Sequence, residues 1–263
     1  MPDLHPIARS RYIIDTHSHT GPYFFHMGSD DVRENLRMCE HWGITRQIVS
    51  ASRGVFHDAV AGNEQMARDL EGNENLRGYA VINQRNLDMA EKEMDRWLQP
   101  GSPFVGVKVH THYPHTTMSS PQLRDAFALF AERRTVMLIH TWGTDVVDLA
   151  RAVKDLDGLQ VIAGHMGADR WDLAVEVAND TPNLWIEPSC SVALAGQMRH
   201  VMTHGPTDRV LLGTDSTLLD PAVAFGQIAA ADLPQEQLED VLWRNAVRLF
   251  GTEALGLPED AAA

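Results

Sequence analysis

Five side chains that can bind a metal ion each follow a short apolar run. Two are histidines two positions apart after Tyr12-Ile13-Ile14, and the whole set is His17, His19, His140, His165 and Asp215. Neutral imidazoles together with a carboxylate suit zinc and related divalent ions. Each residue alone is also typical of a hydrogen-bonded strand end or of a helix cap. Five at comparable positions favour one shared metal site.

The elements that would position these residues alternate along the whole chain, with short β-like runs followed by longer amphipathic helical runs. Eight runs predict strands: Tyr12–His17, Gln47–Ala51, Arg77–Ile82, Phe104–His110, Thr135–His140, Gln160–Gly164, Leu184–Pro188 and Arg209–Thr214. Apolar residues at three- and four-residue spacing predict helices between them, such as Gln122–Arg133 and Asp145–Leu156. A further helix is expected over Gln235–Phe250, between Pro234 and Gly251.

Eight such units predict an α/β fold, a single (β/α)8 TIM barrel that spans residues 1–263. An open doubly wound sheet is the alternative, but the sequence has neither the GxGxxG nor the GxxxxGK[ST] phosphate-binding turn. Barrel active sites lie at the C-terminal ends of the strands, where the five residues would meet. Strand alternation also puts Asp15, His17 and His19 on one face.

Composition narrows the classes of partner. The formal net charge is −14 and no basic stretch occurs, so nucleic acid is not an expected partner. No apolar run has the length of a signal-peptide core or of a membrane span, which predicts no membrane association and a cytoplasmic location. Cys39 and Cys190 lie far apart without metal-finger spacing, so neither a disulfide nor a cysteine nucleophile is expected.

The order of the candidate ligands resembles the amidohydrolase superfamily. The phrases MLIHTWG, VIAGHMG and LLGTDS, with the closing NAVRLFG, are most similar to its amidohydrolase-related branch, and the resemblance runs over essentially the whole chain. It implies a divalent ion, often zinc, held by residues matching His17, His19, His140 and Asp215. It also implies that His165 binds the ion or its water. The branch includes decarboxylases as well as hydrolases.

Lys108 is turned into the expected barrel by strand alternation. In FVGVKVH the three valines share one face and should meet the helices, which leaves Lys108 on the inner face. A buried lysine is costly unless its charge is paired or changed. Three explanations stay open: a carboxylated lysine bridging two ions, as in the binuclear enzymes that the chain resembles; an ammonium that binds an anionic substrate group; or pairing with an interior carboxylate such as Asp15 or Glu187. Whether the site binds one metal ion or two depends on which of these three explanations is correct.

Three residues near these strand ends are candidates for substrate binding. His110 shares the inner face with Lys108. His26 follows the aromatic stretch Tyr23-Phe24-Phe25, where a packed loop cover is an equal alternative. Trp142 comes shortly after His140 and is a candidate for the pocket wall.

The first functional hypothesis is a metal-dependent hydrolase. Metal-activated water attacks the carbonyl of a lactone, amide or related small substrate, Asp215 moves the proton, and His165 polarises the reacting oxygen. Lys108 is the third candidate catalytic residue. The alternative is a non-oxidative decarboxylase or hydratase with the same ligands, and a third reading is a barrel that binds a metal without catalysis. The expected partner is a small-molecule substrate, and the resemblance also admits a homo-oligomer whose neighbouring subunit completes the rim loops.

Overall fold

Seven parallel strands form one curled sheet in the computed structural model, which describes residues 6–27 and 31–262. In order around the sheet they are β1 (Ile14–Thr20), β2 (Arg46–Ala51), β3 (Leu76–Val81), β4 (Phe104–Val109), β5 (Val136–His140), β6 (Gln160–Gly164) and β7 (Leu184–Ile186). Strands that are consecutive in the sequence are neighbours in the sheet. All seven therefore place their C-terminal ends at the same end of the molecule.

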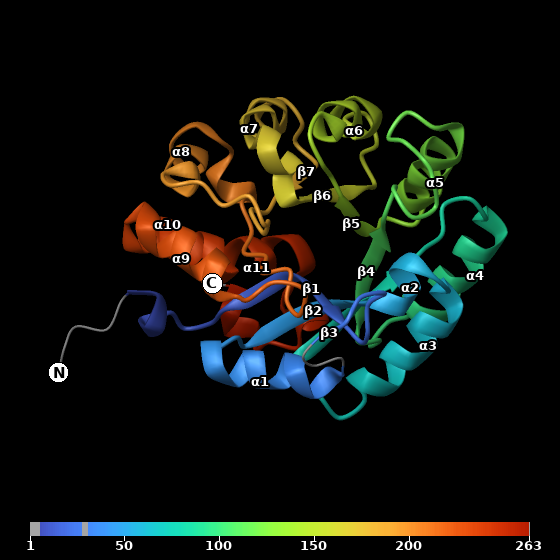
Figure 1. Ribbon diagram of the computed structural model, residues 1–263, viewed down its shortest axis with the longest axis horizontal. Helices are drawn as coiled ribbons and strands as arrows, with labels where there is room; N and C mark the ends of the chain where they lie inside the picture. The colour runs from blue at the N-terminus through green and yellow to red at the C-terminus, as the bar shows by residue number, and fades with distance from the viewer. Residues whose placement is uncertain (1–5, 28–30, 263) are drawn as a thin grey trace.

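The strands are covered on both faces, which explains their apolar sequences. Val161, Ile162 and Ala163 of β6 have no exposed surface, and Leu138 and Ile139 of β5 are equally buried. Parallel sheets need this cover because the helical crossovers pack against one face while the other face encloses the barrel interior. The helices lie around the outside of the curled sheet (Figure 1).

Helices connect the strands, and the two that were predicted with bounds, Gln122–Arg133 and Asp145–Leu156, correspond to α5 and α6. The connecting helices are α1 (Val32–Trp42), α2 (Ser52–Phe56), α3 (Ala59–Leu70), α4 (Leu87–Trp97), α5 (Pro121–Glu132), α6 (Asp145–Val153), α7 (Trp171–Asn179), α8 (Gln197–His204) and α9 (Ala222–Ala231). Side chains cap several N-termini: Asp58 accepts a hydrogen bond from the backbone of Ala61 and Asn86 from that of Met89. Such caps satisfy backbone N–H groups that have no partner within the helix.

The C-terminal part of the chain is helical over residues 235–250. It is built from α10 (Gln235–Glu239), a π-helical turn (Asp240–Arg244) and α11 (Asn245–Phe250). Gly251 ends it with a φ of 79°, a conformation that glycine adopts without steric cost. The short α12 (Thr252–Leu255) follows.

The predicted eighth strand, Arg209–Thr214, is not a regular strand. Instead residues 210–216 touch both edges of the sheet through single bridges, Val210 with Ile186 and Ser216 with Ser18. Leu212 donates its N–H to Val241 rather than to a neighbouring strand, which interrupts the ladder. The segment still lies between β7 and β1, so the ring of the TIM barrel closes without an eighth strand. The TIM-barrel prediction is confirmed, and only the regularity of this strand was wrong.

Asp15 holds that segment to β1. Its carboxylate accepts hydrogen bonds from the N–H of Thr214 at 3.0 Å and from the hydroxyl of Thr214 at 2.6 Å. Ser18 and Gln47 donate to the same carboxylate. The pairing of β1 with β2 shifts register between Asp15 and Ser18, so strict alternation does not hold there. Asp15 therefore belongs to a polar network that closes the barrel.

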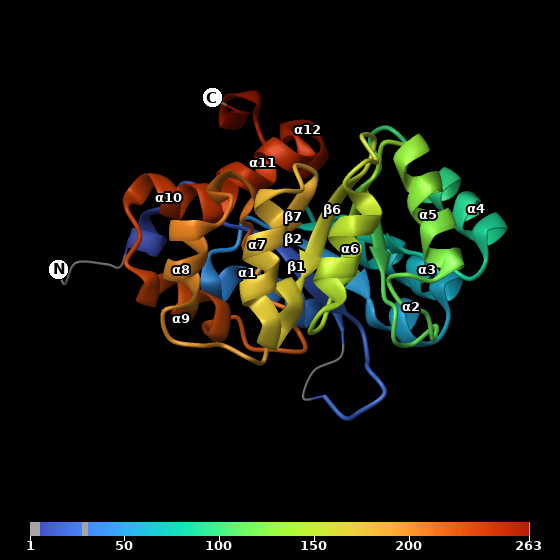
Figure 2. The same cartoon turned by 90° about the horizontal axis from the view of Figure 1, so that it is seen from above.

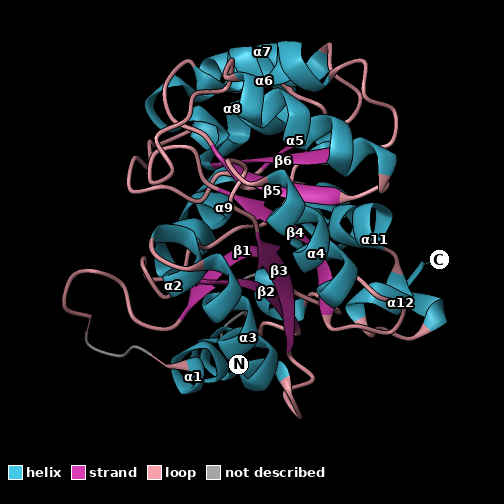
Figure 3. Cartoon of the chain, turned by 90° about the vertical axis from the view of Figure 1, so that its right-hand side faces the viewer, coloured by secondary structure: helices cyan, strands magenta, loops and turns pink. Residues whose placement is uncertain are grey.

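The two ends of the barrel differ in what covers them. The loop after β1 extends from one end, and α11 and α12 lie at the other (Figure 2). Seen from the side, the strands run through the interior of a shell of helices (Figure 3). Within residues 6–27 and 31–262, no helix combines the length and the apolar character that are needed to cross a membrane.

Candidate metal centre and active site

A cavity of about 200 Å³ lies at the C-terminal ends of the strands. Its lining is mostly made of the ionisable residues that follow the strands: His19, Tyr23, Lys108, His110, His112, Tyr113, His140, His165, Asp215 and Leu218. Six of these were predicted as site residues from the sequence. His17 lies beneath the cavity and has no exposed surface.

Three of the predicted ligands come together closely enough to share one ion. His17, His165 and Asp215 each offer a donor atom, and these atoms all lie within 4.8 Å of one another. The β1, β6 and 210–216 segments bring them together, and a non-glycine φ of 57° at Asp215 turns its side chain toward the histidines. The N–H of Asp215 is held by the carbonyl of His17 at 2.8 Å, which stabilises this unusual backbone position.

Oδ1 of Asp215 is a buried oxygen without a hydrogen-bond partner. It lies 3.2 Å from Nε2 of His19 and 3.7 Å from Nε2 of His17, but neither pair meets hydrogen-bonding geometry. A buried polar atom left without a partner costs about 1–3 kcal/mol. A cation shared with the adjacent nitrogens would satisfy it, so the donor set fits a divalent metal ion.

The protonation states of this group are those of a metal site. Burial lowers the pKa of His17, His19 and His165 below the ordinary value, so their rings are neutral and offer lone pairs. Burial alone would raise the pKa of Asp215, but the imidazoles of His19 and His165 beside it lower it overall. Neutral imidazoles with an ionised carboxylate are the ligand forms that divalent ions require.

His140 lies in the cavity wall. Its ring stacks on that of His110, with centroids 4.2 Å apart, and meets His165 edge-on at 4.7 Å. Its nitrogens are not among the donor atoms that lie within 4.8 Å of one another. The structure therefore brings His140 to the site, and its role as a ligand stays a prediction.

Lys108 lies inside the barrel against His17. Nζ is 2.8 Å from Nε2 of His17, and the side chain is 1% exposed. Among the described residues it forms no ion pair, so pairing with Asp15 or Glu187 was the wrong one of the three explanations. Burial lowers the pKa of Lys108 to about 8, against the opposing charges of Asp215 and Glu187.

Two predicted substrate-binding residues lie outside this cavity. His26 is exposed and lines a separate hollow of about 400 Å³ with Thr217 and Leu218, because the loop after β1 turns its side chain away. Trp142 is 39% exposed and stands beside the rings of His140 and His165, with centroids 6.1 and 6.3 Å away. His110 does line the cavity.

Sequence reasoning missed the tyrosines that cover the site. Tyr23 and Tyr113 come from the loops after β1 and β4, and their hydroxyl groups are in contact. Phe24 and Phe56 pack against the ring of Tyr23. The aromatic stretch at residues 23–25 was the available signal, but it did not indicate which ring turns inward.

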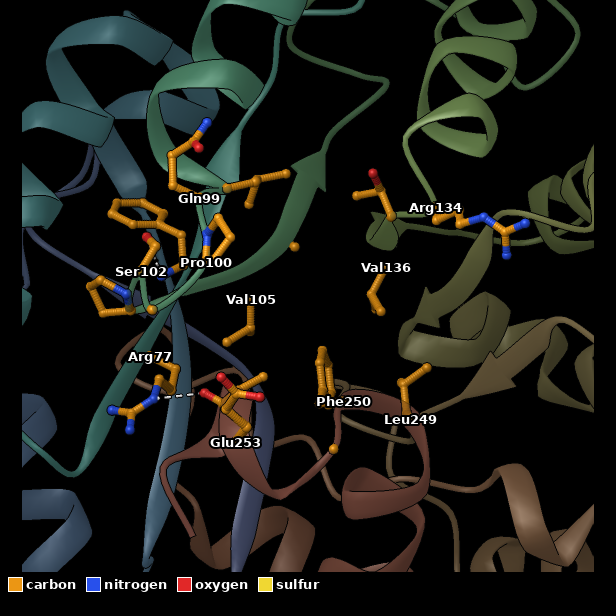
Figure 4. Close-up of a pocket in the computed structure, with 18 of the residues that line it drawn as sticks. Arg77, Gln99, Pro100, Ser102, Val105, Arg134, Val136, Leu249, Phe250 and Glu253 are labelled. Atoms are coloured by element: carbon orange, nitrogen blue, oxygen red, sulfur yellow. Dashed lines mark hydrogen bonds between the residues drawn. The ribbon is translucent and has the colours of Figure 1, made fainter.

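A larger hollow lies at the opposite, N-terminal end of the strands. It has a volume of about 910 Å³ between the starts of β4 and β5 and the C-terminal helices (Figure 4). Its lining contains one carboxylate, Glu253, and no histidine. Arg77 is held there by the carbonyl of Ala254. This end therefore lacks the donor set that the smaller cavity has.

Comparison with known proteins points to one family. A family model described as amidohydrolase matches residues 14–252. No curated protein matches the sequence.

Solved structures share the fold at low identity. A 2,6-dihydroxybenzoate decarboxylase bound to 2,6-dihydroxybenzoate has a TM-score of 0.74 and 15% identity, and the match covers 91% of this chain and 99% of that one. A probable 2-pyrone-4,6-dicarboxylic acid hydrolase from Acinetobacter baumannii has a TM-score of 0.68, 14% identity and the same coverage. A dihydroxybenzoic acid decarboxylase from Polaromonas sp. JS666, with bound manganese, has a TM-score of 0.70, 14% identity and coverage of 92% and 97%.

Proposed function

The chain belongs to the amidohydrolase family, and from that premise we propose that it is a metal-dependent hydrolase that cleaves a small carbonyl substrate such as a lactone or an amide. The observation that carries the proposal is Oδ1 of Asp215, a buried carboxylate oxygen without a hydrogen-bond partner beside two imidazole nitrogens. Such an atom is costly in a protein that never binds a cation there.

Zinc is the metal we propose. His17, His165 and Asp215 would hold it, with His19 and His140 as the further predicted ligands. Imidazole with carboxylate suits zinc but also manganese, and the dihydroxybenzoic acid decarboxylase with a similar fold contains manganese. When bound, the ion supplies Lewis acidity and makes water a stronger acid.

Side chains of the protein would transfer the proton, polarise the reacting oxygen and limit the access of water. Asp215 is ionised and lines the cavity, so it can accept a proton from water and return it to the leaving group. His165 lines the same cavity, and we propose that it polarises the reacting oxygen through the ion that it would hold. Tyr23 and Tyr113 close over the cavity and limit the access of bulk water.

A non-oxidative decarboxylase or hydratase is the second candidate, and Lys108 favours it. This buried cation faces the cavity without a carboxylate partner in the described part of the chain, so it can hold an anionic group of a substrate. The same contact would serve a hydrolase whose substrate is a carboxylate.

One experiment tests the metal and separates the two reactions. The purified protein is analysed for bound metal, then assayed with lactones and with aromatic or dienoic acids in ¹⁸O-labelled water. Incorporation of ¹⁸O into a ring-opened product supports the hydrolase. Release of carbon dioxide without ¹⁸O in the organic product supports the lyase. A protein that binds no divalent ion would overturn both, and a protein that binds metal but turns over neither class would support the non-catalytic reading.

The remaining expectations are part of the same proposal. The partner is a small molecule, and the cavity of about 200 Å³ favours a compact substrate. A cytoplasmic location and a homo-oligomer stay predictions from the sequence.

A further inference from the structure

Glu187 follows β7 and is completely buried beside the candidate metal centre. Three nitrogen atoms surround its carboxylate. Nδ1 of His17 and the backbone N–H of His165 both lie 2.7 Å from Oε1, and the N–H of Ser189 donates to Oε2 at 2.8 Å. Each oxygen therefore accepts a backbone hydrogen bond, Oε1 from His165 and Oε2 from Ser189. Oε1 also faces Nδ1 of His17.

This contact decides which nitrogen of His17 faces the cavity. Oε1 of Glu187 already accepts from the backbone N–H of His165, so it is the acceptor for a hydrogen on Nδ1 of His17, and Nε2 keeps its lone pair. Nζ of Lys108 lies 2.8 Å from Nε2, and an ammonium only donates, which requires the same tautomer. Two contacts on opposite sides of the ring therefore agree.

Glu187 also fixes the position of His165, because it holds the backbone of Ser189, whose carbonyl oxygen contacts the ring of His165. Nδ1 of His165 lies 2.5 Å from the carbonyl oxygen of Ser189, which only accepts, so Nε2 of His165 also keeps its lone pair. The N–H of Ser189 is held by Glu187, and so is the N–H of His165 itself. One side chain consequently fixes the backbone or the ring of both histidines.

Two glycines make room for this arrangement. A Cβ at Gly213 would lie 2.1 Å from Oε2 of Glu187, and a Cβ at Gly164 would lie 3.1 Å from Cε1 of His17. Contacts this short force either the carboxylate or the ring to move. The glycine in LLGTDS is therefore needed for the position of Glu187, and not for a turn.

We propose that Glu187 is a positioning residue that holds His17 and His165 with their Nε2 lone pairs directed at the metal ion. This inference rests on the proposed metal-dependent function. Glu187 does not face the cavity and takes no part in the reaction itself. Carboxylates that receive the other N–H of a ligating histidine raise the affinity of the site by about ten- to a hundredfold.

Glutamine cannot replace Glu187 without a conflict. The amide group has one acceptor oxygen, and its NH₂ group would face either the N–H of Ser189 or the nitrogens that approach Oε1. Glu187→Gln keeps the size of the side chain, so it tests the need for two acceptor oxygens with little change in packing.

The experiment measures zinc affinity with the full-length protein. Wild type, Glu187→Gln and Glu93→Gln are each equilibrated with Zn²⁺ and a competing chelator of known affinity. Glu93 is the matched control because it is also a buried glutamate, hydrogen-bonded to Asn63 and Trp97 on α3 and α4, and none of these three residues lines the cavity. We expect Kd to rise by about ten- to a hundredfold in Glu187→Gln and to stay within about threefold of wild type in Glu93→Gln.

A second measurement covers the case in which Glu187→Gln does not fold. Histidine ¹⁵N spectra of the metal-free wild type should show Nδ1–H tautomers for His17 and His165. Wild-type zinc affinity in Glu187→Gln, or Nε2–H tautomers for these two rings in wild type, would overturn the inference. A wild type that does not bind zinc or manganese would instead overturn the proposed function.

Discussion

Nζ of Lys108 lies 2.8 Å from Nε2 of His17, the nitrogen that a metal ion at this site would need. An ammonium and a cation cannot share one lone pair, so in the free protein Lys108 and the ion compete for His17. This contact makes the two remaining explanations for Lys108, an ammonium and a carboxylated lysine, distinguishable by metal binding.

Lys108→Met should leave one zinc site per chain and tighten it by up to about tenfold, because a competitor for the His17 lone pair is removed. Activity should fall sharply, since the cavity loses its ammonium. Zinc titration and metal analysis check the first part, and substrate assays check the second. Weaker zinc binding, or a fall from two ions per chain to one, would instead support a carboxylated lysine that bridges two ions.

Asp215→Asn should lower kcat by about 10²–10⁴-fold, because the amide cannot accept the proton of water. The fold should persist, since asparagine tolerates the positive φ of 57° at this position better than most residues do. Turnover and far-ultraviolet circular dichroism test the two parts. Asp148→Asn, at an exposed position of α6, serves as the control. Retention of most activity by Asp215→Asn would remove its assignment as the proton carrier.

Asp15→Asn should destabilise the protein by about 1–3 kcal/mol for each donor left unsatisfied, because the asparagine NH₂ group would face other hydrogen-bond donors. The N–H and hydroxyl of Thr214 are the donors that close the barrel against β1. Urea unfolding measures the effect. The exposed Asp157→Asn should change stability by less than about 0.5 kcal/mol. Equal stability of the two variants would show that Asp15 does not hold the ring closed.

Neither cysteine should react with a thiol reagent in the folded protein at pH 8. Burial raises the pKa of Cys39 from 9 to about 12, and burial also raises the pKa of Cys190. Because the folded value lies above the pH, the thiolate fraction of Cys39 is about one in ten thousand, and the thiolate is the reactive form. A colorimetric thiol assay should detect both cysteines in guanidinium chloride. Rapid reaction of Cys190 in the native protein would contradict the expectation that neither cysteine is a nucleophile.

The positions of the strands were largely predictable because they depend on local patterns. The run Gln160–Gly164 was predicted with the bounds that β6 has, and Lys108 was placed on the inner face by alternation alone. The regular eighth strand was wrong because Leu212 donates to Val241, a contact between distant parts of the chain. No periodicity in residues 209–214 could reveal that partner.

The sequence by itself determined which residues stand at the ends of the strands, since strand alternation and the order of βα units are properties of neighbouring residues. That was enough to gather His17, His165 and Asp215 at one rim. Only the tertiary structure decided which atoms meet there, because hydrogen bonds between separate strands depend on distances of a fraction of an ångström. It placed Glu187 behind His17, with Gly213 leaving the space, and turned His26 away from the cavity.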